Sequence, residues 1–243
     1  METVAQPKTR TGGWHFFDAV YCITLTTRPD RHASAAAHFK AVGLQDIVKF
    51  VTVEKHPEDN EQGIYESHMR CMAKGLAAGA RHILIFEDDI VFRGFSEQKL
   101  RQCIGFLDQN DSGRILFLGC LVTKSRRTQH PGIRSVDYRA LTHAYVIENS
   151  LAAEMVAKKW PRKPYDVVLA ELPDVKFACC PSFAFQSNSP SDNKRLKRLE
   201  TIRRLCGGLG FIQKMNERYH RHKAAIITAH LLLAGALLWW CLR

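Results

Sequence analysis

Short apolar segments alternate with helix-forming segments along most of the chain. Strands that are apolar along their whole length are typical of a sheet covered on both faces, and their alternation with helices is typical of parallel strands. The strand candidates are residues 19–25, 46–53, 82–86 and 114–120. The helix candidates are residues 31–44, 64–79 and 96–110. This pattern predicts an α/β domain over residues 18–193, with a mostly parallel, Rossmann-like sheet and helices on both faces.

The chain of 243 residues is long enough for one such domain with a full core. Residues 1–17 are mostly polar and contain Pro7 and two glycines, so we expect a flexible leader. Residues 121–135 are basic and contain Pro131, and we expect them to form a loop. The eight cysteines lack the spacing of zinc or redox motifs, which favours reduced, mostly buried thiols.

The positive charge is concentrated near the C-terminus. The formal net charge is +11, and residues 194–223 hold ten Lys and Arg against two Glu. Leu196, Leu199 and Ile202 recur at three-residue spacing among these cations, which predicts a basic amphipathic helix. A polybasic segment beside an apolar one favours an anionic membrane surface as its partner, and we expect no nucleic acid.

Residues 224–242 carry no charged side chain and would reach ~28 Å as a helix, close to the ~30 Å of a bilayer's hydrocarbon core. Trp239 and Trp240 lie where interfacial aromatic residues are common. We therefore predict a C-terminal membrane anchor over residues 224–243, with the remainder in the cytoplasm because the basic residues precede it. Thr228 and His230 leave open an anchor that lies in the membrane plane.

Three consecutive carboxylates, Glu87, Asp88 and Asp89, follow the apolar strand candidate at residues 82–86. Like charges this close raise one another's pKa unless a cation compensates them. In an extended stretch Glu87 and Asp89 would point to one side, and two hard oxygen ligands there suit Mg²⁺ or Mn²⁺ held jointly with a phosphate. The alternative is a carboxylate cap of the following turn or helix.

A second polar cluster, Arg28, Asp30 and Arg31, follows the first strand candidate. Guanidinium groups pair with phosphate oxygens, and ligands of open α/β sheets bind beyond the carboxyl ends of the strands. Both clusters occupy that position in the expected sheet. The alternative is a surface pair of Arg and Asp that caps the next helix.

Taken together, these segments resemble glycosyltransferase family 25, the lipopolysaccharide-core and collagen galactosyltransferase group. Residues 19–31 (AVYCITLTTRPDR) are similar to the family's opening signature, and residues 63–92 (GIYESHMRCMAKGLAAGARHILIFEDDIVF) to its block of helix and acidic strand. Glu66 stands where that family commonly has a cysteine. Residues 142–156, 164–169 and 185–192 resemble its later segments, in the same order.

The resemblance implies a GT-A fold in which Glu87 and Asp89 bind a divalent metal, Mn²⁺ or Mg²⁺, against the diphosphate of a nucleotide sugar. It also places other residues around the donor. These implied donor-binding residues are Arg28, Arg31, Ser67, His68, Asp88 and Gln186. His68 could equally be a satisfied helix histidine, and the loop of Gln186, Asn188 and Asp192 could be merely solvated.

Family-25 enzymes are regarded as inverting, and an inverting transfer needs a carboxylate base for the acceptor hydroxyl. Our candidate is Asp166, which lies between Pro164 and Pro173. The alternative is that Asp166 caps a helix, with Glu171 and Asp174 as further candidates for the base.

The sequence therefore predicts a membrane-attached glycosyltransferase that moves a hexose from a UDP-sugar to a glycan, lipid-linked or lipopolysaccharide-type acceptor. One alternative is a catalytically inactive nucleotide-sugar-binding protein of the same fold. Another is a phosphotransferase or hydrolase that uses the same carboxylates with a metal, although the chain has no Walker lysine loop or nucleophile elbow.

Overall fold

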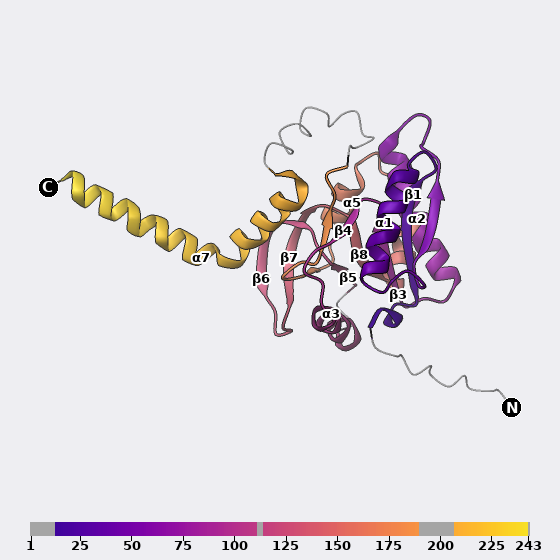
Figure 1. Ribbon diagram of the computed structural model, residues 1–243, viewed down its shortest axis with the longest axis horizontal. Helices are drawn as coiled ribbons and strands as arrows, with labels where there is room; N and C mark the ends of the chain where they lie inside the picture. The colour runs from indigo at the N-terminus through magenta and orange to yellow at the C-terminus, as the bar shows by residue number, and fades with distance from the viewer. Residues whose placement is uncertain (1–12, 111–113, 190–206, 243) are drawn as a thin grey trace.

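The computed structural model describes residues 13–110, 114–189 and 207–242 (Figure 1). The strands are β1 (Ala19–Leu25), β2 (Lys49–Val53), β3 (His82–Glu87), β4 (Ile90–Phe92), β5 (Ile115–Phe117), β6 (Leu121–Arg127), β7 (Ile133–Ala140), β8 (Ala144–Glu148), β9 (Lys176–Cys179) and β10 (Ala184–Gln186). The helices are η1 (Gly13–Phe16), α1 (Pro29–Ala41), α2 (Asn60–Ala77), α3 (Glu97–Gln109), α4 (Asn149–Val156), α5 (Tyr165–Glu171) and α7 (Gly208–Cys241).

Eight strands form the central sheet in the order β2-β1-β3-β8-β5-β9-β7-β6, and β4 pairs with β10 in a small second sheet. The neighbours β2, β1 and β3 are parallel, as are β5 and β9. Strand β8 runs antiparallel between β3 and β5, and β7 runs antiparallel to both β9 and β6. The sheet is therefore mixed, and its longest run of parallel neighbours is β2-β1-β3.

Helices cover both faces of the sheet, because successive strand residues point to opposite sides. Leu84 and Phe86 of β3 pack on the side of α1 and α3, where Phe39 is fully buried. Ile83 and Ile85 pack on the other side, against α2, α4 and α5. The expected α/β architecture is confirmed. The seven cysteines within the described residues are free, and five of them are buried, as expected.

Local sequence explains how α2 reaches the sheet. Asp59 caps its first turn, since the carboxylate accepts the backbone N–H of Glu61 at 2.8 Å. Farther along, a Cβ at Gly75 would lie 2.5 Å from Cδ1 of Ile83. Glycine at this position therefore lets α2 lie close against β3, which places His68 beside the end of that strand.

Part of the predicted leader, residues 13–17, belongs to the fold instead. Residues 13–16 form η1, and Trp14 and Phe16 are buried in the core. The indole N–H of Trp14 donates to the carbonyl of Val42 at 2.7 Å. The burial of these two aromatic side chains holds the segment on the domain, although its glycine and polar residues predict a loop. Residues 1–12 lie outside the described part of the chain.

The expectation of a basic loop over residues 121–135 is wrong. Strands β6 and β7 form an antiparallel hairpin there. Val122, Ile133 and Val136 are buried, while Lys124, Arg126 and Arg127 between them are exposed. The alternation was hidden by the number of Lys and Arg residues, which dominate the composition of this segment.

The last helix, α7, has two parts with different surroundings. Its first part is docked on the sheet: Gln213 donates to the carbonyl of Ala184 at 2.9 Å, and Glu217 accepts the backbone N–H of Ser182 at 2.9 Å. The backbone is non-helical at His222, where the helix kinks. Beyond the kink the helix leaves the domain, as Figure 1 shows in yellow, and its side chains are exposed.

This helix is long and apolar enough to cross a membrane, by length and composition. The expected boundary between residues 223 and 224 falls one residue after the kink. Of the expected basic amphipathic helix, residues 194–206 lie outside the described part, and residues 208–222 form the docked part of α7.

Asn216 holds α7 against the edge of the sheet. Its amide nitrogen donates to the carbonyl of Val122, and its amide oxygen accepts the N–H of Val122, both at 3.0 Å. We expect Asn216→Ala to lower the free energy of unfolding by about 1–2 kcal/mol, because both backbone groups lose a partner. Urea unfolding in detergent measures this, with the exposed Lys214→Ala as a control expected to change it by less than ~0.5 kcal/mol. Equal stability of the two variants would contradict this role for Asn216.

Candidate active site

Five segments meet at the edge of the sheet where β1 and β3 end. Strand β3 ends at Glu87, and Asp88 and Asp89 form the turn before β4. Because β8 runs antiparallel to β3, the residues just before it, including Thr142, lie at the same edge. The small sheet pairs Gln186 with Ile90 and so brings β10 to the turn. The starts of α1 and α5 complete this edge.

Asp88 is buried, and its carboxylate accepts hydrogen bonds from β1 and α1. One oxygen accepts the hydroxyl of Thr24 at 3.0 Å, and the other accepts Nη1 of Arg31 at 3.2 Å. Burial raises the pKa of Asp88 against the opposing effects of Arg31 and Thr24. Both carboxylate oxygens are therefore engaged by side chains of the chain itself.

Asp89 lies beside the same guanidinium and has a free oxygen. Its Oδ2 accepts Nε2 of Gln186 at 2.6 Å and lies 3.8 Å from Nη1 of Arg31. Its Oδ1 is buried and has no hydrogen-bond partner among the described residues. Burial and the charge of Glu87 raise the pKa of Asp89 to about 7. A cation placed at Oδ1 would remove both the desolvation cost and the repulsion.

Glu87 points to the other face of the sheet, toward α2. Its Oε1 accepts the hydroxyl of Thr142 at 2.5 Å and lies 3.4 Å from Nε2 of His68. The other nitrogen of His68 lies 3.0 Å from the hydroxyl of Tyr145, and the imidazole stacks on Tyr165 with ring centroids 4.1 Å apart. Burial pushes the pKa of Glu87 upward, but His68 and Thr142 outweigh it, so the net pKa is lowered.

The expected arrangement of the three carboxylates differs from the observed one. We expected Glu87 and Asp89 on one side, whereas Asp88 and Asp89 both lie near Arg31 and Glu87 faces His68. The alternation of an extended stretch ends with β3 at Glu87, and the turn redirects Asp89. Within residues 13–110, 114–189 and 207–242, no group of three or more His, Cys, Asp or Glu side chains is placed to hold a metal ion.

Two of the predicted donor-binding residues have local partners. The hydroxyl of Ser67 donates to the carbonyl of Gly63 at 2.6 Å, inside its own helix. Arg28 forms an ion pair with Asp30 at 2.9 Å, which matches the alternative of a surface pair, and this contact lowers the pKa of Asp30 to about 2. Arg31, His68, Asp88 and Gln186, in contrast, contact one another or the acidic turn.

Asp166 lies in the first turn of α5, and Pro164 takes the N-cap position. Its Oδ1 accepts the hydroxyl of Tyr138, whose ring stacks on Phe117 at 4.2 Å. Burial raises the pKa of Asp166 to about 6, the bond from Tyr138 opposes the rise, and the charge of Glu87 adds to it. The carboxylates of Asp166 and Glu87 therefore interact electrostatically.

The two further candidates for a base are engaged in ion pairs. Glu171 binds Lys163 at 2.7 Å, and more than half of the Glu171 side chain is exposed. Asp174 binds Arg114 at 2.7 Å. Neither of these pairs includes a residue of the acidic turn.

Thr142 and Tyr138, which hold Glu87 and Asp166, were not predicted from the sequence. Between them lies Leu141, with a φ of 79°. This left-handed conformation is uncommon for a leucine and sharpens the bend that leads from β7 to Thr142. The segment YRALTH has no composition that distinguishes it from an ordinary strand, so the pattern alone gave no signal.

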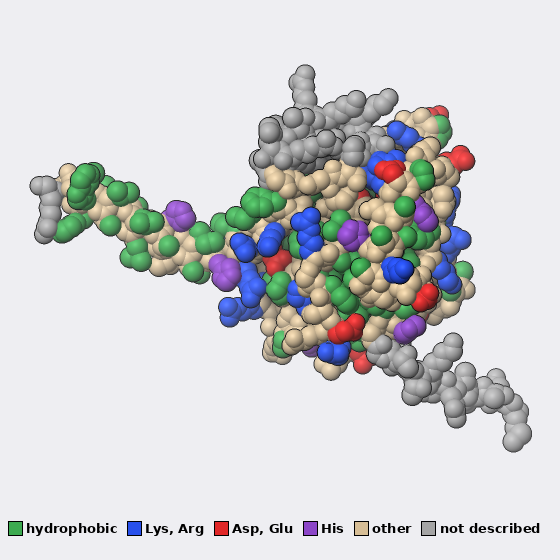
Figure 2. Space-filling model, viewed as in Figure 1, with side chains coloured by type: hydrophobic (Ala, Val, Ile, Leu, Met, Phe, Trp, Pro, Cys, Tyr) green, Lys and Arg blue, Asp and Glu red, His purple; other side chains and the backbone are tan. Residues whose placement is uncertain are grey.

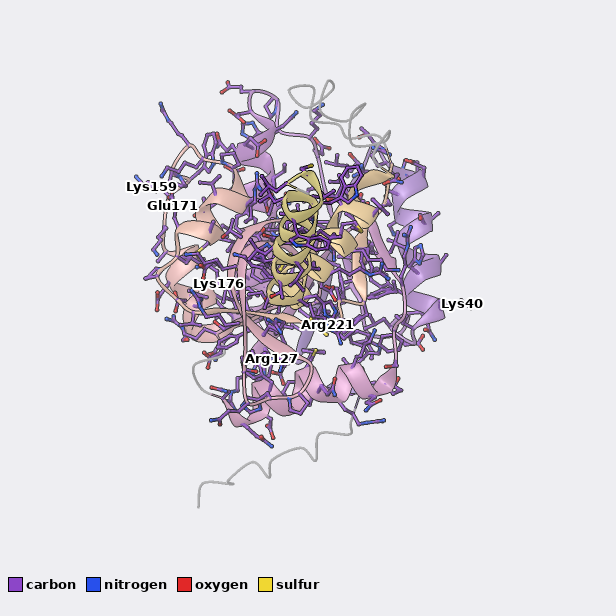
Figure 3. All side chains as sticks on the ribbon, turned by 90° about the vertical axis from the view of Figure 1, so that its left-hand side faces the viewer. Lys40, Arg127, Lys159, Glu171, Lys176 and Arg221 are labelled. Carbon is purple, nitrogen blue, oxygen red and sulfur yellow. The ribbon has the colours of Figure 1, made fainter. Side chains whose placement is uncertain are left out.

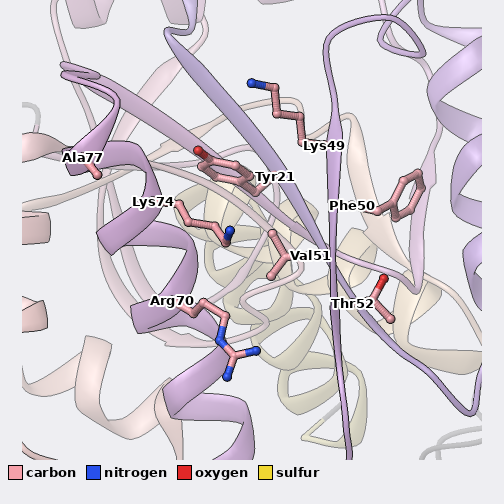
Figure 4. Close-up of a pocket in the computed structure, with 8 residues that line it drawn as sticks. All are labelled: Tyr21, Lys49, Phe50, Val51, Thr52, Arg70, Lys74 and Ala77. Atoms are coloured by element: carbon pink, nitrogen blue, oxygen red, sulfur yellow. The ribbon is translucent and has the colours of Figure 1, made fainter.

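Two cavities flank α2. One of about 860 Å³ lies between the start of α2 and the end of α4, and Tyr65 and Trp160 contribute to its wall. The ring of Tyr65 is 6.1 Å from that of Tyr165, which stacks on His68. The other, of about 640 Å³, lies beside the edge strand β2 and is lined by Tyr21, Lys49, Phe50, Val51, Thr52, Arg70, Lys74 and Ala77 (Figure 4).

No protein-family model matches the chain, and no curated protein does. Solved structures share parts of its shape. A glycosyltransferase involved in the glycosylation of the major capsid of PBCV-1 has a TM-score of 0.45 at 9% identity, covering 75% of this chain and 99% of that one.

Two further structures are similar at the same level. Mannose-1-phosphate geranyltransferase from Thermus thermophilus has a TM-score of 0.43 at 8% identity and covers 67% of this chain and 73% of that one. HddC from Yersinia pseudotuberculosis has a TM-score of 0.37 at 10% identity and covers 66% and 68%. These likenesses are remote, and the resemblance to family 25 stays a prediction.

Proposed function

We propose that this protein is a metal-dependent glycosyltransferase that uses a nucleotide-sugar donor. The observation that supports this most is the buried, unpartnered Oδ1 of Asp89, beside Arg31, at the carboxyl end of two parallel strands. That position is the usual ligand site of such sheets. A buried carboxylate whose pKa is raised to about 7 gains stability when a cation neutralises it.

Asp89 would hold Mn²⁺ or Mg²⁺ through its unpartnered Oδ1, and Glu87 would have to turn away from His68 to become the second ligand. Their oxygens are the hard ligands that these ions prefer, and Glu87 is 25% exposed, so it can be reached from outside. Two protein carboxylates leave further coordination positions for phosphate oxygens and water. The bound ion would neutralise the charge that develops on the departing diphosphate.

Arg31 would bind the diphosphate. Its guanidinium is held by Asp88 at 3.2 Å and so is oriented before a ligand arrives. Gln186, through its 2.6 Å bond to Asp89, fixes the carboxylate on the same side. Arg28 and Ser67 contribute less in this arrangement, since both have local partners. A UDP-sugar with a hexose is the donor that the family resemblance implies.

Asp166 would accept the proton of the acceptor hydroxyl in a transfer with inversion. A base works best when its pKa is close to the working pH, and burial raises the pKa of Asp166 to about 6. The cavity beside Tyr65 and Trp160 lies on the same face of the sheet as Glu87, and it would receive the acceptor. An aromatic wall with polar neighbours suits the apolar and hydroxyl faces of a sugar.

The acceptor would be a lipid-linked or lipopolysaccharide-type glycan at the cytoplasmic face of a membrane. The exposed, apolar part of α7 supports this, because anchoring would confine the enzyme to the plane in which such an acceptor lies. The orientation with the domain in the cytoplasm follows from the basic residues that precede this part.

A panel of nucleotide sugars tests the proposal on the purified full chain. With Mn²⁺, we expect one UDP-sugar to bind by saturation-transfer NMR and to be slowly hydrolysed, and we expect EDTA to abolish both. Binding without any turnover would favour the inactive nucleotide-sugar-binding protein. Release of phosphate from simple phosphate esters would favour the metal-dependent phosphotransferase or hydrolase.

Metal binding should depend on pH. Because a ligand carboxylate must be deprotonated and the pKa of Asp89 is raised to about 7, the affinity for Mn²⁺ should fall as the pH drops below 7, by up to about tenfold per unit. Above that pH it should level off. Titration with Mn²⁺ followed by electron paramagnetic resonance between pH 5.5 and 8 measures this. Affinity that stays constant across this range would exclude Asp89 as a ligand.

A further inference from the structure

Basic side chains gather where α7 leaves the domain (Figure 2). The hairpin of β6 and β7, residues 121–140, has five basic residues and one acidic residue. Residues 208–223 of α7 have four basic residues and one acidic residue. We call six of the exposed cations of these two elements the basic exit surface. Its members are Lys124, Arg126, Arg127, Arg218, Arg221 and Lys223.

The two elements are fixed against each other. Asn216 binds both backbone groups of Val122, at the free edge of β6. Burial lowers the pKa of His220, as do the charges of Lys223 in α7 and Arg134 in β7, while a hydrogen bond with the backbone of Val122 opposes this shift. The hairpin and the docked part of α7 are therefore in direct contact and together form one continuous surface.

This surface faces the direction in which α7 projects. Figure 3, which views the molecule from that side, shows Arg127 and Arg221 near the base of the projecting helix. Residues 224–242, which follow Lys223 beyond the kink, carry no charged side chain, and the side chains of Leu231 and Trp240 are 68% and 74% exposed. If this part of α7 lies in a bilayer, the headgroups must lie next to its base.

The charge of the surface is only partly compensated within the protein. Asp137 lies 3.1 Å from Arg126 and 3.8 Å from Lys124, and both of these cations are more than half exposed. Among the described residues, neither Arg127 nor Arg221 forms an ion pair of 4 Å or less. Exposed cations that lack an ion-pair partner and lie beside an apolar helix are complementary to the negative charge of an anionic leaflet.

We propose that the basic exit surface binds anionic phospholipid headgroups, and that the β6–β7 hairpin is a second membrane contact beside α7. Two contacts on one continuous surface restrict how the domain tilts on the membrane, which a single helix does not. The edge of the sheet with the acidic turn would then keep a constant orientation to the bilayer. This inference goes beyond sugar transfer and does not depend on it.

Hydrogen exchange of the full chain in lipid nanodiscs tests the proposal. We expect the backbone of residues 124–133 to exchange about fivefold more slowly in phosphatidylcholine mixed with phosphatidylglycerol than in phosphatidylcholine alone. High salt should remove the difference. Equal exchange in the two lipids would overturn the proposal. That result would mean that the hairpin is covered by a second copy of the chain or is not covered at all.

Matched variants separate charge from folding. Arg126→Glu with Arg127→Glu should lose the protection, whereas Arg126→Lys with Arg127→Lys should keep it, because Lys and Arg are attracted to anionic headgroups alike. Lys40→Glu with Lys159→Glu, at positions that Figure 3 places toward the sides of the domain, should also keep it. Loss of protection in this last pair, or its persistence in the first, would overturn the proposal.

Discussion

Asp89→Ala is expected to abolish metal-dependent turnover of the nucleotide sugar. The variant removes the buried oxygen that lacks a partner and also the carboxylate that Gln186 and Arg31 face. Without it the leaving diphosphate would lose the neutralising ion, and we expect kcat/KM to fall by at least about 10²-fold. Donor hydrolysis in the presence of Mn²⁺ measures the loss, and EDTA should have no further effect on the variant.

Two comparisons make this result specific. Asp89→Asn keeps the size of the side chain and a hydrogen-bond acceptor for Gln186, so it tests the charge rather than the packing. Asp108→Ala removes an exposed carboxylate of α3 and should leave turnover unchanged. If Asp89→Asn kept both its turnover and its sensitivity to EDTA, Asp89 would not be a metal ligand.

The parts of the fold that the sequence predicted well are those in which local signals agree with tertiary packing. Strand β1 has the predicted bounds, and α3 differs by one residue at each end, with Ser96 as its N-cap. In both, the pattern of apolar residues matches the face that is buried. Short, fully apolar strands need a cover on both faces wherever they occur, so the α/β architecture follows from them directly.

The hairpin and the reversed strand β8 were not predictable in the same way. The direction of β8 depends on its partners β3 and β5, which lie far from it in the sequence. The hairpin has basic residues on its exposed face and only a few buried ones, so its composition resembles that of a loop. Pairing across the sheet decides both features, and no local segment encodes it.

The residues of the candidate site also fall into a part that the sequence predicted and a part that it did not. The sequence identified the acidic turn, Arg31 and His68, because their residue types and positions after strands are local properties. It gave the wrong sides for the carboxylates, since the backbone direction after Glu87 depends on the pairing of β4 with β10. It also missed Thr142, which reaches Glu87 only because β8 starts at the same edge.

Asp166→Asn is expected to keep donor binding and lose sugar transfer. The asparagine retains an acceptor for Tyr138 but does not accept a proton, so we expect transfer to fall by about 10²–10⁴-fold. Saturation-transfer NMR measures binding of the UDP-sugar, and product formation measures transfer. Glu154→Gln, which changes an exposed carboxylate of α4, should leave both unchanged. Transfer at the normal rate in Asp166→Asn would exclude Asp166 as the base.

The pH dependence distinguishes a base from a residue that only holds the fold. Transfer should rise with pH through about 6, because burial raises the pKa of Asp166 to that value and only the ionised form accepts a proton. The hydrogen bond from Tyr138 lowers the pKa of Asp166, so its loss in Tyr138→Phe should raise that pKa. The midpoint of the pH profile should then move to higher pH while Asp166 stays in place. An unchanged midpoint in Tyr138→Phe, together with normal folding, would mean that another group controls the reaction.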